Sequence, residues 1–155
     1  MQFASKEDIE APIAEVFAML SEFEAYERSA LRRGIEVQRV NEDAPQAAGM
    51  AWDAAFTMRG KHRKLHVVLA EYNPPNAMRF ESDSQGLDAI LTVDLLALSP
   101  RRTRMAITLT LSPKNLSARL FVQSLKLAKN NLNKRFRHKV ADYAKAVEDR
   151  HARTA

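Results

Sequence analysis

The 155-residue sequence contains no cysteine, which excludes disulfide bonds, thiol nucleophiles and thiolate metal ligands. It has only four glycines, and they form no glycine-rich loop of the kind that holds phosphate groups. No apolar run approaches the ~20 residues that a membrane-spanning helix needs. The first residues contain neither the basic segment nor the apolar segment of a secretion signal, so we expect a cytoplasmic protein.

The residues that are present are enough for a single domain, residues 1–155. Their number is near the common domain size, and 46% of them are hydrophobic, which is enough to bury a core. No internal repeat, low-complexity linker or change of composition marks a second domain. The sequence carries no signal for an oligomeric state.

The net charge is +5, and the basic residues gather in residues 61–64, in residues 101–104 and in the last predicted helix. Solvated hairpin turns and a solvated helix face account for such clusters. Peripheral contact with an anionic membrane is one alternative, and contact with RNA is another. No aromatic-rich RNA-binding signature accompanies the basic residues, which argues against nucleic acid.

Residues 113–150 are predicted to form one long helix. Apolar side chains recur there at steps of three and four residues, which is the helical period. This stripe comprises Phe121, Leu125, Ala128, Leu132, Phe136, Val140, Tyr143 and Val147. A helix of this length spans roughly 50 Å, so we expect it to lie across a whole sheet.

The first half of this predicted helix has a second apolar edge, formed by Leu116, Leu120 and Leu127, almost opposite the stripe. Two interpretations stay open. The edge contacts an amino-terminal loop or the rim of the sheet, or it is a surface for a partner or for ligand entrance.

Before this helix the apolar period indicates a strand, two short helices and then a series of strands. Residues 2–9 are predicted to form a short edge strand. Residues 11–20 are predicted to form a helix, because Pro12 suits a first helical turn and apolar side chains follow at helical spacing. Residues 23–31 are predicted to form a second helix, because their apolar side chains also lie on one side. From residue 35 the period changes to two, which is typical of antiparallel strands. Turns are predicted at residues 60–61, 73–76, 85–86 and 99–103.

These turns set pairings that can be compared, because a slip of one residue moves every side chain to the other face. They place Phe56 opposite Leu65, Val67 opposite Phe80, and Phe80 opposite Leu91, so apolar side chains meet at each pair. One face of the predicted sheet is then continuously apolar and the other is mostly charged or threonine. Such a sheet needs one cover, which the long helix supplies.

For the last turn, the side chains that would face inward distinguish between two possible loop lengths. A two-residue loop would turn Ala106 and Thr108 inward, whereas a three-residue loop turns Ile107 and Leu109 inward. We therefore predict a bulged or three-residue hairpin, because it keeps the inner face apolar.

The order of these elements resembles the helix-grip arrangement of the START-like (SRPBCC) superfamily, which includes polyketide cyclases/dehydrases and Bet v 1-type proteins. Residues 9–17 (Ile-Glu-Ala-Pro-Ile-Ala-Glu-Val-Phe) look like the opening segment of that superfamily, and residues 23–26 look like the segment that follows. Gly49 with Trp52, and residues 74–80, resemble later strand starts. The resemblance covers essentially the whole chain.

The resemblance implies an α+β helix-grip fold. We expect a curved antiparallel sheet of six or seven strands, wrapped around one long C-terminal helix, with two short helices after the first strand. It also implies a cavity between sheet and helix. Members bind lipids, sterols, quinones or polyketides, and some catalyse cyclisation, dehydration or hydrolysis.

We therefore expect binding of a hydrophobic small molecule, such as a lipid, a polyketide or a quinone-like compound. The cavity is expected to be lined by Trp52, Phe56, Val67, Phe80, Leu91, Val93, Ile107, Leu109, Leu125, Leu132 and Phe136. The last three would form its roof. One alternative is an enzyme of the polyketide cyclase or aromatase kind. Another is an interaction module that uses its basic helix face on a membrane, RNA or protein partner.

No catalytic residue emerges from the resemblance or from the residues. Ser82 is the clearest inward polar side chain, and it lies at a strand end; Asp53, His66 and Tyr72 are predicted on the outer face. The four histidines have no metal-ligand spacing, and no H-E-x-x-H pattern occurs. We predict no metal site and no cofactor.

Overall fold

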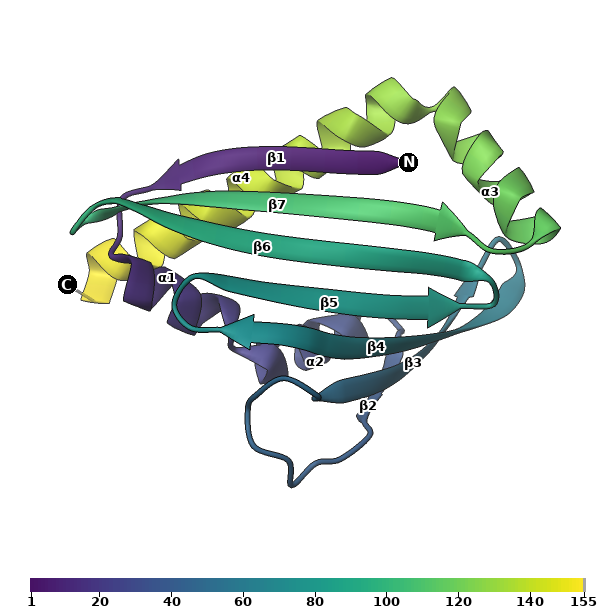
Figure 1. The fold of residues 1–155 in the computed structure, drawn as a ribbon, viewed down its shortest axis with the longest axis horizontal. Coiled ribbons are helices and arrows are strands. Elements are labelled where there is room, and N and C mark those ends of the chain that lie inside the picture. The colour runs from purple at the N-terminus through teal and green to yellow at the C-terminus, as the bar shows by residue number, and fades with distance from the viewer. Residues whose placement is uncertain (155) are drawn as a thin grey trace.

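The computed structural model describes residues 1–154 and contains a seven-stranded antiparallel sheet with strand order β1-β7-β6-β5-β4-β3-β2 (Figure 1). The strands are β1 (Gln2–Ile9), β2 (Glu36–Arg39), β3 (Ala51–Met58), β4 (Lys61–Asn73), β5 (Ala77–Ser84), β6 (Leu87–Ser99) and β7 (Arg102–Pro113). The helices are α1 (Ile13–Leu20), α2 (Phe23–Arg32), α3 (Leu116–Leu127) and α4 (Lys129–Thr154). The predicted helix-grip fold class is confirmed.

Helices α1, α2 and α4 lie on one side of the sheet, and α4 crosses it diagonally behind β1 in the view of Figure 1. The core joins the inner face of the sheet to α1 and α4, and its buried side chains include Val16, Leu69, Met105, Val140 and Val147. No helix of residues 1–154 combines the length and the apolar character needed to cross a membrane.

The predicted C-terminal helix over residues 113–150 is not continuous. Residues 102–113 form strand β7, and the helical segment that follows is divided at Ala128, whose φ of −108° and ψ of 19° lie outside the helical range. Helix α3 then points away from the direction of α4 (Figure 1). The prediction failed because the apolar spacing runs through the break, so the pattern for two helices equals the pattern for one.

The β5–β6 pairing agrees with the prediction, because Phe80 lies opposite Leu91. Strand β7 turns Ile107 inward, as predicted, and places it opposite Val93. The β6–β7 register shifts between Ala97 and Ser99, so the hairpin is bulged as predicted.

The predicted β3–β4 register is wrong by two residues. Ala54, and not Phe56, lies opposite Leu65, because the turn is formed by Arg59 and Gly60. Both turn residues have positive φ, 53° and 75°, as a two-residue hairpin turn of type I′ requires. A shift of two residues leaves every side chain on its predicted face.

The predicted β4–β5 register is also wrong by two residues, because Leu69 lies opposite Phe80 and Val67 opposite Ser82. In addition, the register shifts between Leu69 and Glu71. This bulge reverses the side-chain phase, so Tyr72 lies on the inner face and not on the outer face as predicted. Its hydroxyl donates to Ser21 Oγ at 2.9 Å.

Candidate functional site

The hollow with the most apolar lining lies between the inner face of the sheet and the helices, and we call it the main hollow. Its volume is about 470 Å³, within the range of small-molecule pockets. Its lining residues are Leu20, Tyr26, Val67, Met78, Phe80, Ser82, Ala89, Leu91, Val93, Ile107, Leu109 and Tyr143. Only Tyr26, Ser82 and Tyr143 carry polar side-chain atoms. The hollow is therefore suited to an apolar molecule with few polar groups.

A second hollow of about 280 Å³ lies beside it, between α2 and strands β2 and β3. Tyr26, Val67 and Phe80 border both hollows. Trp52, Ala54 and residues of α2 complete the walls of the second one. The two spaces are therefore direct neighbours, with these three side chains between or beside them.

A cluster of aromatic rings joins α2 to the sheet beside these hollows. The ring of Phe23 meets Trp52 edge-on at 5.5 Å and Phe80 edge-on at 6.0 Å. Tyr72, turned inward by the β4 bulge, lies 6.2 Å from the same ring. Edge-to-face pairs at such separations stabilise packing beyond simple burial, so α2 is held in one position.

A charged group closes the second hollow at α2. Glu27 accepts two hydrogen bonds from the Arg39 guanidinium, both of 2.9 Å, and a third of 3.3 Å from the Trp52 indole. The Glu27 carboxylate raises the pKa of Arg39. The paired carboxylate therefore ties α2 to Arg39 on β2 and to Trp52 on β3.

Two tyrosine hydroxyls meet at the rim of the main hollow. Tyr26 Oη lies 3.0 Å from Tyr143 Oη and donates to the carbonyl oxygen of Leu20 at 2.9 Å. A phenol has one proton, so Tyr143 is the donor between the two rings and its oxygen keeps free lone pairs. Although Tyr26 is 40% exposed, its hydroxyl end points to these partners.

Burial raises the pKa of both tyrosine hydroxyls, and the neighbouring Tyr143 adds to the effect at Tyr26. Both phenols therefore stay protonated at neutral pH. In this arrangement both phenol protons are already donated, so the pair can accept a hydrogen bond from a ligand hydroxyl through the free lone pairs of Tyr143, but the phenols are not bases.

The structure brings together only part of the cavity lining expected from the sequence. The main hollow is bordered by Val67, Phe80, Leu91, Val93, Ile107 and Leu109, and the second hollow by Trp52. Phe56 lies further along β3, opposite Arg63.

The residues expected at the roof border neither hollow. Leu125 belongs to α3, Leu132 lies near the start of α4, and Phe136 packs on Phe3 with ring centres 5.8 Å apart. Helix α4 reaches the main hollow through Tyr143 instead.

Sequence reasoning missed Leu20, Tyr26 and Tyr143 as lining residues. Leu20 and Tyr26 come from the short helices, and Tyr143 was assigned only to the apolar stripe of the last helix. The available signal was a tyrosine within an otherwise aliphatic stripe, since a buried phenol usually needs a hydrogen-bond partner.

Ser82 lines the main hollow, as its inward register predicts, and its hydroxyl donates to the Ala89 carbonyl at 3.4 Å. The bond is long, so the hydroxyl is also accessible to a ligand.

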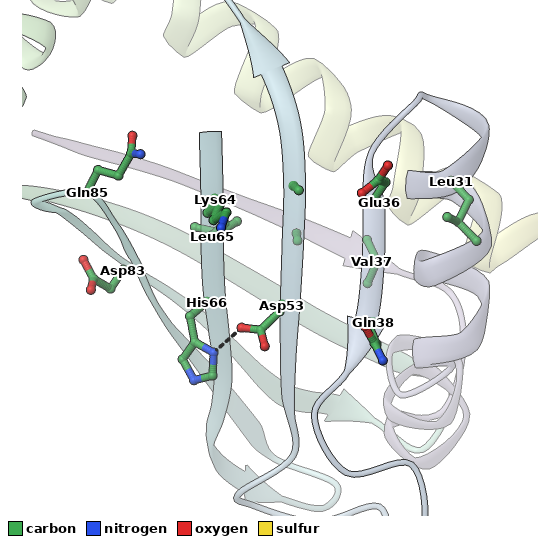
Figure 2. Close-up of a pocket in the computed structure, with 12 residues that line it drawn as sticks. Leu31, Glu36, Val37, Gln38, Asp53, Lys64, Leu65, His66, Asp83 and Gln85 are labelled. Atoms are coloured by element: carbon green, nitrogen blue, oxygen red, sulfur yellow. Dashed lines mark hydrogen bonds and ion pairs between the residues drawn. The ribbon is translucent and has the colours of Figure 1, made fainter. Parts of the chain in front are cut away.

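A third hollow lies on the outer face of the sheet, where Asp53 and His66 are joined by a 2.7 Å contact between Oδ1 and Nδ1 (Figure 2). Asp83 stands opposite His66 on β5. The two paired side chains are 67% and 50% exposed, as their predicted outer position requires. A solvent-exposed pair of this kind contributes little binding energy, so the inner hollows are the better candidates. No three His, Asp or Glu side chains among residues 1–154 are grouped as metal ligands.

The curved antiparallel sheet and the helices that cover one side of it define a helix-grip fold. No family model and no curated protein matches the sequence. Solved structures do resemble the chain over most of its length.

One is TTHA0849 from Thermus thermophilus, with a TM-score of 0.64 and 18% identity over 100% of this chain and 99% of that one. Another is the Zhui aromatase/cyclase from a Streptomyces species, with a TM-score of 0.63 and 13% identity; the match covers 99% of this chain and 94% of that one. A START superfamily protein from Mycobacterium smegmatis has a TM-score of 0.54 and 12% identity; the match covers 90% of this chain and 98% of that one. These likenesses establish the fold.

Proposed function

We propose that this protein binds a hydrophobic small molecule, of the lipid, polyketide or quinone type, in the main hollow. The observation that carries the proposal is the nearly continuous apolar lining, interrupted by Ser82 and by the paired hydroxyls of Tyr26 and Tyr143. Burial of apolar ligand surface contributes roughly 25 cal/mol per Å², from which the cost of ordering is subtracted. A ligand with one hydroxyl near the tyrosine pair fits this lining best, because the Tyr143 oxygen keeps free lone pairs.

The proposal is tested by a substitution that places a larger side chain inside the main hollow. Ala89 is half-buried on β6 and borders the hollow, so Ala89→Phe places a ring in the space that a ligand would occupy. Ala4 is exposed on β1, opposite Thr108, so Ala4→Phe adds the same ring outside the hollow. The probes are palmitic acid, a naphthoquinone and an anthraquinone, and the measurement is the shift in melting temperature.

At least one probe is expected to raise the melting temperature of the wild type and of Ala4→Phe, but not of Ala89→Phe. Circular dichroism checks that both variants fold, and native mass spectrometry after organic extraction identifies any lipophile that copurifies. Equal shifts for Ala89→Phe and the wild type would place binding elsewhere, and no shift with any probe and no copurified lipophile would argue against the function.

The second candidate function is an enzyme of the polyketide cyclase or aromatase kind. The tyrosine pair favours it, because a neutral Tyr143 that turned its proton from Tyr26 to the substrate would stabilise charge that develops on a carbonyl oxygen. Cyclisation also needs a base, and the described residues that line the main hollow include no carboxylate or imidazole. Binding without turnover is therefore the function that the lining supports better. Loss of turnover of an aromatic polyketide on Tyr143→Phe, with its binding retained, would reverse this order.

The cytoplasmic location expected from the sequence stays a prediction. Fractionation of cells that produce the protein at its native level would test it.

A further inference from the structure

Helix α3 has an exposed leucine edge, formed by Leu116, Leu120 and Leu127, which are 72%, 63% and 91% exposed. At ~100° per residue the three side chains project within about 40° of one another. The opposite side of α3 is covered, because Ala118 and Val122 are buried there. The helix therefore has two apolar sides, and only one of them belongs to the core.

The chain around this edge carries charge of one sign. Residues 95–141 contain eleven Lys and Arg and no Asp or Glu. Arg119 and Lys126 stand on α3 beside the leucine edge, and Lys129 begins α4; all three side chains are exposed. An exposed apolar edge whose charged neighbours on the helix are all cations is typical of a helix that lies in the interface of an anionic membrane.

The leucine edge is held in place by contacts at two hairpin turns. Asn115 caps α3, since its Oδ1 accepts from Ala118 N at 2.8 Å and its Nδ2 donates to the Gln85 carbonyl at 3.2 Å. Near the middle of the helix, the Arg59 guanidinium lies 5.2 Å above the Phe121 ring. Because α3 is fixed at both turns, its leucines are presented on a preformed surface.

We propose that α3 docks on an anionic membrane surface. The three leucines enter the boundary between headgroups and acyl chains, and Arg119, Lys126 and Lys129 face the phosphate groups. A second copy of this chain is a poorer occupant, because pairing α3 with itself brings cations together with no carboxylate from the same segment to neutralise them.

Docking would also place one end of the main hollow near the bilayer. Ser82 and Ala89 border the hollow on β5 and β6, and the turn between these strands is the one that Asn115 contacts. This link to the hollow rests on the proposed function. Docking itself does not, because it is measured on vesicles with no added ligand.

The test uses co-sedimentation of the whole protein with vesicles of phosphatidylcholine alone or of phosphatidylcholine with phosphatidylglycerol. One variant combines Leu116→Ser, Leu120→Ser and Leu127→Ser. Its matched control combines Leu31→Ser, Leu96→Ser and Leu98→Ser, which changes three leucines that are 56%, 59% and 39% exposed elsewhere on the surface. A third variant, Arg119→Glu with Lys126→Glu, keeps the leucine edge and reverses its flanking charge.

The wild type and the control are expected to sediment with the anionic vesicles, more weakly as salt is raised. The α3 leucine variant and the charge-reversal variant are expected to bind at least about tenfold more weakly, with unchanged circular dichroism. Equal binding by the leucine variant and its control would overturn the proposal, as would equal binding to both kinds of vesicle. A dimer that the α3 leucines hold together, with no vesicle binding, would assign the edge to a second copy and also overturn it.

Discussion

Helices α3 and α4 arise from one continuous apolar pattern, yet they relate to the sheet in opposite ways. Helix α4 buries Val140, Ala144 and Val147 against the core, whereas α3 leaves three leucines exposed. The sequence period does not distinguish them, although α3 has 12 residues and α4 has 26. What differs is the surface that each meets, because α4 runs along the sheet beside β1 while α3 is attached at the β3–β4 and β5–β6 turns (Figure 1).

The comparison teaches that apolar side chains on neighbouring helices can serve two purposes within one chain. In α4 the apolar side chains stabilise the fold. In α3 a part of them is available for another surface. The following substitutions separate the two roles, because each changes one helix and leaves its neighbour as the reference.

The largest expected effect comes from placing a carboxylate on each helix. Val140→Asp buries an unpaired charge in the core and should lower the free energy of unfolding by more than about 4 kcal/mol, or prevent folding. Leu120→Asp, on the exposed edge of α3, should change it by no more than about 0.5 kcal/mol. Urea unfolding followed by circular dichroism measures both. Similar losses for the two variants would show that the leucine edge is covered within the fold.

The next largest effect is expected at the contact that attaches α3 to the β5–β6 turn. A Cβ at Gly86 would clash with the Asn115 side chain, and Gly86 has a φ of +90°. Gly86→Ala should therefore lower the free energy of unfolding by about 2–3 kcal/mol and speed amide exchange throughout α3.

Gly34→Ala is its control, since Gly34 has a similar φ of +82° but no atom within 4 Å of the added carbon. It should cost about 1 kcal/mol and leave exchange in α3 unchanged. Equal destabilisation by the two substitutions would mean that Asn115 moves aside freely.

The tyrosine pair links α4 to α2, and it should make stability depend on alkaline pH. Burial raises the pKa of Tyr26 and Tyr143 in the folded state above the ordinary value near 10. This stabilisation is complete below pH 10 and is lost as pH rises towards the raised values, because the unfolded phenols ionise first.

Above pH 10 the free energy of unfolding should fall by at most about 1.4 kcal/mol per pH unit for each phenol, and by less for Tyr26 because it is partly exposed. The variant Tyr26→Phe with Tyr143→Phe should lose stability less steeply than the wild type above pH 10. Parallel pH profiles would contradict the raised pKa values.

The smallest expected effect concerns the end of α4. Arg150 forms a bidentate pair with Glu22, including a 2.7 Å bond from Nη2 to Oε2, and it lowers the pKa of the Glu22 carboxyl. Both side chains are partly exposed, so Arg150→Ala should lower the free energy of unfolding by less than about 1 kcal/mol. The difference should be present near neutral pH and vanish as acid protonates Glu22 below its ordinary value of 4.5. A loss that persists in acid would point to packing of the arginine stem instead.

Much of the fold was predictable, because alternation of apolar side chains decides which face of a strand is buried. The turn at Gln85 and Gly86 set the β5–β6 register, and the requirement for an apolar inner face identified the β6–β7 bulge. Tyr72 was misplaced because the β4 bulge has no distinctive residue, and a single inserted position reverses the phase after it.

The site was predictable on the sheet side and not on the helix side. Residues such as Leu91 and Ile107 follow from strand register, which is a local property. Whether Phe136 or Tyr143 faces the hollow depends instead on where α4 crosses the sheet and where it begins. Both are decided by packing between distant segments, for example Phe136 on Phe3, and no local pattern encodes them.

The contact between Gly86 and Asn115 has a consequence for sequence variation. The amide of Asn115 occupies the space that a side chain at position 86 would need, and the same amide caps α3. The two positions are therefore expected to vary together. Among homologues that keep this helix, a residue larger than glycine at position 86 should occur only where position 115 holds a smaller cap such as serine.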